Sequence, residues 1–424
     1  MKERALLIVP HQDDEINLVG NILDRIVAKW EVYVLYSSLD SNKEKGIVRK
    51  NEALEACKLW GIDVEHIVFL EYPDTPNAEG KHFYTSDLSL SRKIVDDLKN
   101  NIYIIKPEVI FATDFDFHSD HRMISLAFDT AMGEILNTDR NYTPLVLKGF
   151  CYETAFYGPE DYKASEIGES SAKNEEVLSN PSYLWNERIS IKSNEPNRLI
   201  WNRKAYKGLS KHKSQYAVLH ARSIINDDNV FWLRRTDNLL RYAKIVASSG
   251  DVSKLNDFKI LDTDDIITIN PREISYKKAL WMPDSDTSEI IISFSQEEII
   301  SEIIIHGNPS DISARSVTCS IYVEEKNVAQ ISEIEPYGRD TKIKFDRLKT
   351  NSLVLKFMNC TEEFGISEIE IFQGEVKALG GQEFQQIDKN IGKGIIDVID
   401  VIGYSWNVFW TRVIRKMRNT FYRK

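Results

Sequence analysis

The sequence predicts an α/β domain with a doubly wound, mostly parallel sheet, followed by an all-β sandwich and a C-terminal amphipathic helix. Three observations lead to this prediction. Residues 1 to about 150 alternate short apolar runs with helical patterns. Residues 257–375 contain closely spaced strand patterns, and residues 390–424 are apolar at helical spacing with a basic end. A chain of 424 residues has room for two or three domains.

The first part of the chain alternates between two periodicities. Its short apolar runs are rich in β-branched residues, which is typical of strands that are covered on both faces. We expect strands at 5–9, 32–36, 67–70, 109–112 and 145–150. We expect helices between them at 15–28, 43–60, 88–105 and 122–136. This alternation indicates a parallel sheet with helices on both faces, in a domain that spans residues 1–250.

The chain that follows is more varied. Residues 158–196 are acidic and rich in Ser, Asn, Glu and Pro, so we expect an insertion that forms a flexible loop or a lid. Helical patterns return at 198–219 and 236–246. Strands of the sandwich are expected at 290–294, 303–305, 317–321, 342–345, 353–357 and 369–372.

Composition and charge restrict the function. The net charge is −11 and no basic stripe occurs in the main body, which argues against nucleic acid as a partner. The four cysteines are scattered without a CxxC pair, so we expect reduced thiols in a cytoplasmic protein. The apolar run after Lys2 and Arg4 is shorter than the ~7–15 residues of a signal-peptide core, so we expect no signal peptide.

Two polar clusters directly follow predicted strands. His11, Asp13 and Asp14 come after the run at 5–9, and a second cluster, His118-Ser119-Asp120-His121, comes after the run at 109–112. Because the carboxyl ends of parallel strands meet at one edge of a sheet, these side chains should share one crevice. The combination of imidazole and carboxylate groups predicts a hydrolytic metal site.

The spacing within the clusters suggests a role for each residue. His11 and Asp14, three positions apart, can bind one cation, and His121 is the natural third ligand. Asp13 is then available as general base. We expect His118 to act as acid or electrophile, unless it only positions other groups. Asp120 either orients His118 in its charged form or caps the following helix.

These motifs resemble those of the PIG-L-type (LmbE-like) N-acetylglucosaminyl deacetylases. That family carries His-x-Asp-Asp-Glu after its first strand and a distal His-x-Asp-His. The resemblance implies zinc bound by His11, Asp14 and His121, with Asp13 as the base, although such a site also accepts Fe²⁺. Further family-like fragments are Arg49-x-x-Glu52, Tyr72-Pro73-Asp74 and Lys211-His212-Lys213-Ser214-Gln215, whereas Gln12 replaces the commoner Pro.

Three of these additional residues have alternative interpretations. Arg49 is a candidate substrate contact, but it can equally pair with Glu52 on its own helix. Asp74 either binds substrate hydroxyl groups or stabilises a turn. His212 is more typical of a helix surface than of a site.

Residues 257–375 resemble, more distantly, discoidin-like (F5/8 type C, galactose-binding-like) sandwiches. The resemblance depends on Ala279-Leu280-Trp281, on Ser293-Phe294 before the isoleucines at 303–305, and on the closing 366–371. Such domains often bind sugars through their loops, although many are scaffolds.

The tail at 390–424 is a separate segment. Residues 395–418 form an amphipathic pattern in which Trp406 and Trp410 precede a basic end, which favours binding to an anionic membrane surface. The alternative is a helix that docks on the sandwich or at a dimer interface. Two aspartates and two glycines interrupt the ~20 apolar residues that a transmembrane helix needs.

Together these features predict a zinc-dependent hydrolase that removes the acetyl group of an N-acetylglucosamine-type sugar. The expected substrate is a glycolipid or polysaccharide precursor, and the protein would be cytoplasmic, peripheral on the membrane face. One alternative is hydrolysis of another N-acyl bond, such as that of a thiol–sugar conjugate. Another is a non-catalytic sugar-binding or assembly protein.

Overall fold

A computed structural model describes residues 2–74, 80–151, 180–193, 202–218, 228–268, 270–310 and 313–374, together with residues 170, 177 and 224. The predicted tail at 390–424 and most of the predicted insertion at 158–196 lie outside these residues. None of the described helices is long and apolar enough to cross a membrane.

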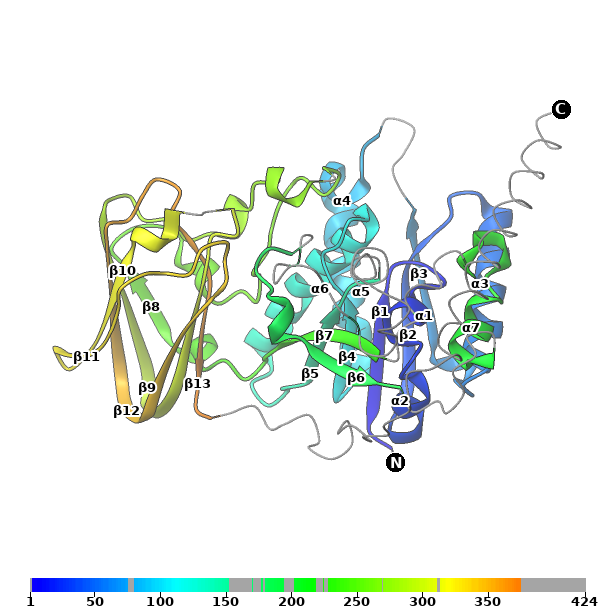
Figure 1. Cartoon of the computed structure of the whole chain (residues 1–424), viewed down its shortest axis with the longest axis horizontal. Coiled ribbons are helices and arrows are strands. Elements are labelled where there is room, and N and C mark those ends of the chain that lie inside the picture. The colour runs from blue at the N-terminus through cyan, green and yellow to red at the C-terminus, as the bar shows by residue number, and fades with distance from the viewer. Residues whose placement is uncertain are drawn as a thin grey trace, which may run out of the picture.

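The first sheet has the strand order β3-β2-β1-β4-β5-β7-β6 (Figure 1). Its strands are β1 (Arg4–Val9), β2 (Glu31–Leu39), β3 (Ile67–Pro73), β4 (Val109–Thr113), β5 (Leu145–Gly149), β6 (Ile189–Lys192) and β7 (Asp228–Arg234). β1 to β5 are parallel, whereas β7 is antiparallel to both β5 and β6. The predicted mostly parallel sheet is therefore confirmed, with an antiparallel edge that the sequence did not predict.

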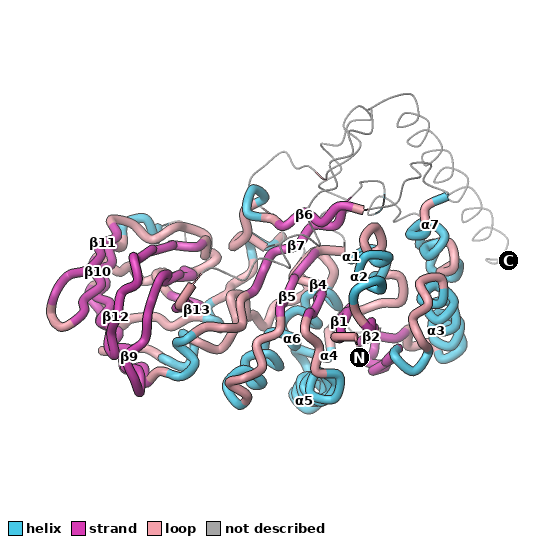
Figure 2. The backbone as a smooth tube through the Cα atoms, turned by 90° about the horizontal axis from the view of Figure 1, so that it is seen from below, coloured by secondary structure: helices cyan, strands magenta, loops and turns pink. Residues whose placement is uncertain are grey.

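Helices cover both faces of this sheet (Figure 2). They are α1 (Asp14–Val19), α2 (Leu23–Lys29), α3 (Lys43–Lys58), α4 (Phe83–Ser86), α5 (Leu88–Ile105), α6 (Ser119–Thr138) and α7 (Lys204–Leu209). Leu7 of β1 packs in the core with α1, α2 and α3, whereas Leu6 and Ile8 pack in the core with α5 and α6. Since successive side chains of a strand point to opposite faces, both faces of β1 are buried, as the apolar run predicts.

Several predicted elements differ from the structure. The helix expected at 15–28 is interrupted between α1 and α2, where Asn21 bonds to Asn229 and to the carbonyl of Asp228. Within residues 202–218, the described part of the helix expected at 198–219, the structure has the short helix α7 and 3₁₀ turns such as Lys213–Gln215 instead of one long helix. The helix expected at 236–246 is wrong: a 3₁₀ turn at Leu239–Tyr242 leads into strand β8 (Lys244–Ala247), because pairing with β9 overrides local propensity.

Part of the predicted insertion belongs to the sheet. β6 is an edge strand that pairs with β7, and Trp185 just before it packs with Trp232 in a small aromatic core. Within the predicted insertion, residues 189–192 are therefore strand, and the turns at 180–188 pack against the sheet through Trp185.

The second sheet is antiparallel, in the order β11-β10-β12-β9-β13, with β8 also paired to β9. Its other strands are β9 (Thr287–Gly307), β10 (Thr318–Val323), β11 (Lys326–Ile331), β12 (Asp340–Met358) and β13 (Ile366–Phe372). β9 and β12 each join two of the predicted strands, and their pairing shifts register near Leu348 and Ser352. Ile292 before the shift and Ile303 after it share one core, so the sheet bends around its own apolar side chains.

The two sheets are connected by chain that contributes to both cores. β8 precedes residue 250 yet belongs to the second sheet, whereas Phe258, Ile266 and Tyr276 follow it and pack in the α5/α6 core of the first. The predicted domain boundaries near 250 and 257 therefore fall between segments that each pack with the other domain. Gly133 of α6 illustrates the close packing, since a Cβ there would lie 2.2 Å from the carbonyl oxygen of Asp257.

Candidate metal centre and cavity

The first polar cluster forms a tight loop between β1 and α1. Asp13 has a φ of 139°, a conformation that side chains rarely adopt, and its backbone nitrogen donates to Glu15 Oε2 at 2.9 Å. Asp14 begins α1, so its carboxylate is fixed to a helix that packs on the sheet. Strained backbone of this kind is retained mainly where function requires it.

His11, Asp14 and His121 come together around one carboxylate oxygen. Asp14 Oδ2 lies 3.1 Å from His11 Nδ1 and 3.2 Å from His121 Nε2. Ligand atoms of a tetrahedral zinc site with bonds of ~2.1 Å stand ~3.4 Å apart, so each of the two distances to Asp14 suits a pair of neighbouring ligands. Among the described residues, the sets whose possible ligand atoms all lie within 4.8 Å of one another are His11, His118 and His121; Asp14, His121 and Cys151; and His11, Asp74 and Asp120. The Sγ atom of the free, buried Cys151 also lies within 4.8 Å of ligand atoms of Asp14 and His121.

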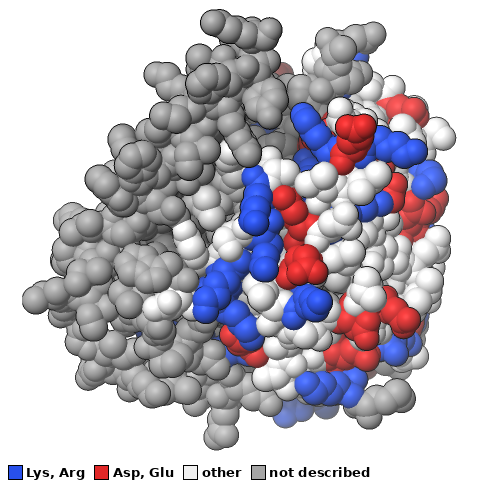
Figure 3. All heavy atoms as spheres, turned by 90° about the vertical axis from the view of Figure 1, so that its right-hand side faces the viewer, with Lys and Arg blue, Asp and Glu red and all other residues white. Residues whose placement is uncertain are grey.

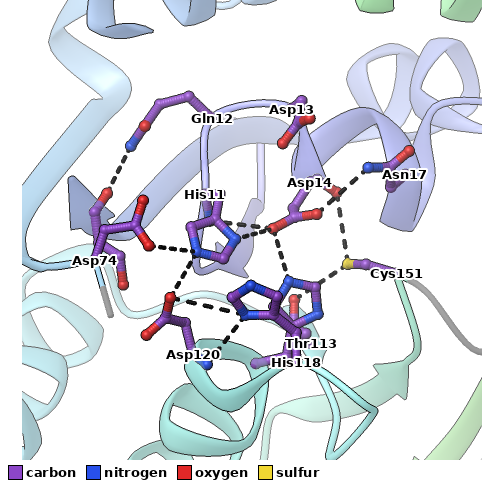
Figure 4. Close-up of polar contacts among 12 residues, drawn as sticks. His11, Gln12, Asp13, Asp14, Asn17, Asp74, Thr113, His118, Asp120 and Cys151 are labelled. Atoms are coloured by element: carbon purple, nitrogen blue, oxygen red, sulfur yellow. Dashed lines mark hydrogen bonds and ion pairs between the residues drawn. The ribbon is translucent and has the colours of Figure 1, made fainter. Parts of the chain in front are cut away.

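In His11 and His121, the ring nitrogen that does not face Asp14 hydrogen-bonds to another carboxylate. His121 Nδ1 lies 2.6 Å from Asp116 Oδ2, and His11 Nε2 lies 2.9 Å from Asp120 Oδ2. Figure 4 shows Asp14, Asp74 and Asp120 around the His11 ring. Carboxylates in this position orient metal-binding imidazoles and fix their tautomers. Burial alone would lower the pKa of His121, but Asp116 and Asp14 raise it to about 9, so a bound ion would displace protons.

Asp120 does not contact its expected partner closely. Its Oδ2 is 3.7 Å from His118 Nδ1, whereas its two oxygens bond to His11 and to His82. Burial alone would raise the pKa of Asp120, but these hydrogen bonds hold it well below its usual range. The geometry favours Asp120 as a partner of His11.

His118 caps helix α6. Its Nδ1 accepts from the backbone nitrogen of Asp120 at 3.2 Å, which leaves the ring proton on Nε2. The side chain is one-third exposed and lines the cavity. Burial, together with the His11 and His121 imidazoles, lowers the pKa of His118 to about 4, so the ring is neutral rather than charged as expected.

Asp13 lines the cavity together with His11 and His118. Burial, reinforced by the neighbouring Asp14 carboxylate, raises the pKa of Asp13 to about 7, whereas His212 and Arg49 act to lower it. A carboxylate with a pKa near neutrality accepts and returns a proton readily.

The cavity has a volume of about 410 Å³ and brings together residues from distant parts of the sequence. Its lining residues are His11, Asp13, Asp40, Lys45, Arg49, Asp74, His118, Ser214 and Gln215. Arg49 donates to Asp74 Oδ2 at 2.9 Å and to Gln215 Oε1 at 2.6 Å. Glu52, the alternative partner of Arg49, instead accepts from the backbone and hydroxyl groups of Ser214.

The structure also places residues that the sequence did not assign to the site. His212 is fully buried and lies 2.8 Å from Glu15, so the expectation of a surface residue is wrong. Asp116, His82 and Gln215 were not predicted. Two of them had a sequence signal: Asp116 lies in the same loop as His118, and Gln215 ends the family-like fragment Lys211-His212-Lys213-Ser214-Gln215. A basic run in α7 and the residues after it, Lys204 to Lys213, leads directly into Ser214, and Lys and Arg gather in a band on this side of the molecule (Figure 3).

A family model matches the part of the chain that contains both polar clusters, and a curated relative matches a stretch of similar length. Residues 6–132 match the family model described as PIG-L: GlcNAc-PI de-N-acetylase. A Bos taurus relative, N-acetylglucosaminyl-phosphatidylinositol de-N-acetylase, is 24% identical over 135 residues, which is 31% of this chain and 51% of the relative. The chain thus spans about half the length of the curated relative that it matches.

Solved structures show weaker likenesses. N,N'-diacetylchitobiose deacetylase from Pyrococcus horikoshii is 15% identical, with a TM-score of 0.35 over 55% of this chain and 84% of its own. The family 32 CBM from C. perfringens NanJ, in complex with galactose, is 13% identical, with a TM-score of 0.24 over 31% of this chain and 94% of its own. The discoidin-like resemblance of residues 257–375 stays a prediction. In its polar motifs and in its match to the family model, the segment at residues 6–132 is thus similar to a PIG-L family domain.

Proposed function

We propose that the protein is a metal-dependent N-deacetylase of an N-acetylglucosamine-type amino sugar in a glycolipid or polysaccharide precursor. The observation that carries the proposal is the convergence of His11, Asp14 and His121 beside a cavity that also contains Asp13 and His118. The match of residues 6–132 to a de-N-acetylase family supports the choice of reaction.

The donor set fits zinc, with Fe²⁺ as the alternative, since two imidazoles and one carboxylate suit both ions. His11, Asp14 and His121 would hold the ion. When bound, it supplies Lewis-acid chemistry that polarises an acyl oxygen and acidifies water.

Asp13 moves the proton in the reaction that we propose. Its carboxylate takes a proton from water as the water oxygen bonds to the acetyl carbon. The same proton then passes to the sugar nitrogen as the carbon–nitrogen bond breaks, which yields acetate and a free amine. Burial and the neighbouring Asp14 carboxylate raise the pKa of Asp13, which strengthens it as a base and helps it to return the proton.

His118 stabilises developing charge as a neutral donor. Because Nδ1 accepts from the backbone nitrogen of Asp120, the ring proton is on Nε2, and we propose that it is donated to the acyl oxygen in the cavity. Arg49, Asp74 and Gln215 also line the cavity, and we propose that Arg49 and Asp74 bind sugar hydroxyl groups. Lys45 in the cavity lining and the lysines that precede Ser214 in the chain suit the phosphate groups of a precursor.

Three further assignments rest on sequence patterns. We propose that the range predicted at 1–250 is one catalytic unit and that the range predicted at 257–375 is a sugar-binding sandwich, except that β8 belongs to the second sheet and Phe258, Ile266 and Tyr276 to the first core. We also propose that 395–418 hold a cytoplasmic protein at the membrane surface. Deletion of 390–424 should then release the protein from anionic vesicles without changing its activity on soluble substrates, and unchanged vesicle binding would refute the membrane role.

A substrate panel tests the proposed reaction. Acetate release is measured with zinc-loaded protein on N-acetylglucosaminides with lipid and soluble aglycones, on other N-acyl amines and on a thiol–sugar conjugate. Release from the glucosaminides supports the proposal. Cleavage of only the other amides favours the alternative enzyme, a hydrolase of another N-acyl bond. Sugar binding without cleavage favours the non-catalytic role.

A further inference from the structure

We infer that His82 is a positioning residue of the metal centre, which acts through Asp120 to hold the His11 ring in its metal-binding orientation. The inference rests on the proposed metal site and adds a residue that neither polar motif contains. His82 lies 38 positions before Asp120 in the sequence, at the start of α4.

The three side chains form a buried chain of hydrogen bonds. His82 Nε2 lies 2.8 Å from Asp120 Oδ1, and Asp120 Oδ2 lies 2.9 Å from His11 Nε2. His82 and Asp120 are both fully buried, and His11 is 6% exposed. Water therefore does not compete for these contacts, and hydrogen bonds to a buried charge are strong.

A backbone contact determines which atom donates the proton in each of these hydrogen bonds. His82 Nδ1 accepts from the backbone nitrogen of Tyr84 at 3.1 Å, so the ring proton of neutral His82 is on Nε2 and is donated to Asp120. The other Asp120 oxygen is then oriented to accept the Nε2 proton of His11. This leaves His11 Nδ1, 3.1 Å from Asp14 Oδ2, as the atom that binds the ion.

The competing explanation is that His82 only caps α4. The two roles use different atoms, since Nδ1 caps the helix and Nε2 reaches Asp120. Two substitutions therefore separate them. His82→Asn keeps an acceptor near the position of Nδ1 but cannot reach Asp120, whereas His82→Gln keeps a donor near the position of Nε2.

Zinc affinity, measured by competition with a chromophoric chelator, provides a readout that does not depend on turnover. We expect folded His82→Asn to bind zinc about 10–100-fold more weakly than wild type, the range typical of lost outer-sphere partners. His82→Gln should bind zinc nearly as wild type does. At saturating zinc, kcat of His82→Asn should recover.

A double-mutant cycle with Asp120→Asn tests the connection itself. If His82 acts through Asp120, adding His82→Asn to Asp120→Asn should weaken zinc binding no further. Wild-type affinity in folded His82→Asn, or losses that multiply in the double variant, would overturn the inference. If His82→Asn does not fold, weak zinc binding by folded His82→Gln overturns it instead. Failure of the wild-type protein to bind zinc would refute the metal site, a different result.

Discussion

The guanidinium of Arg49 lies 2.9 Å from Asp74 Oδ2, so that helix α3 and the chain that leaves β3 meet at the cavity wall. The same side chain reaches Gln215, whose amide in turn donates to the carbonyl of Gln12 in the first polar loop. Arg49 thus connects the wall of the cavity to the loop that carries the candidate base.

Arg49→Lys should reduce kcat/KM about tenfold or more without loss of bound metal. Lysine retains the charge but has a single ammonium group, which cannot bridge Asp74 and Gln215 as the planar guanidinium does. Steady-state kinetics with metal analysis checks this. The control is Lys50→Ala, on the same helix as Arg49. It removes only a surface ion pair with Glu71 and should leave activity almost unchanged.

Zinc should stabilise the wild-type protein but not Asp14→Asn. An ion that binds only the folded state at 100 times its Kd adds about 2.7 kcal/mol to the free energy of unfolding. The melting temperature should therefore fall on chelation and recover with zinc. Asp14→Asn should melt at the same temperature with and without zinc, and an equal zinc shift in this variant would contradict the assigned ligand.

Gly133→Ala should destabilise the fold by about 1–3 kcal/mol. The added methyl group would collide with the carbonyl oxygen of Asp257, where the chain between the sheets packs on α6. Gly374→Ala is a suitable control, because nothing lies within 4 Å of its added Cβ. Urea denaturation measures both, and equal midpoints for the two variants would refute this packing.

Stability should decrease between pH 6.5 and pH 10 because of His306 in the second sheet. Burial alone would lower the pKa of His306, but Asp340 and Glu370, each 3.0 Å away, raise it to about 10 from an ordinary 6.5. The folded state thus holds a proton that the unfolded state has lost in this range. The stabilisation is complete below pH 6.5 and disappears as the pH rises through 10.

His306→Gln removes this titration. The melting temperature of the variant should fall less steeply than that of wild type across the same pH range, with the other titrating groups common to both proteins. Parallel curves would show that the buried triad does not retain its proton.

The parallel strands were predictable because each is a short apolar run buried on both faces. β6 and β7 were not, since their pairing depends on residues far away in the sequence and on an acidic segment that reads as a loop. β8 was predicted as helix because its pairing with β9 likewise depends on residues far away in the sequence. In the second sheet, β9 and β12 were each predicted as two separate strands, because the bends in them interrupt the alternation of apolar and polar residues.

In the site, His11, Asp14 and His121 were predictable because they directly follow strands that end at one edge. His82 and Gln215 reach the site from loops whose path depends on the whole fold. His212 was misjudged because its burial is explained only by Glu15, which lies nearly 200 positions earlier, an ion pair that no local pattern shows.

The most direct test of the central claim compares zinc-loaded wild type with Asp13→Asn by mass spectrometry of an N-acetylglucosaminide substrate. The substitution keeps the shape of the side chain and the three ligands but removes the group that accepts the proton. We expect the wild type to remove one acetyl group and the variant, with the same zinc content, to be slower by about 10²-fold or more. Equal deacetylation by both proteins would contradict the assigned base, and no deacetylation by zinc-loaded wild type would contradict the proposed function.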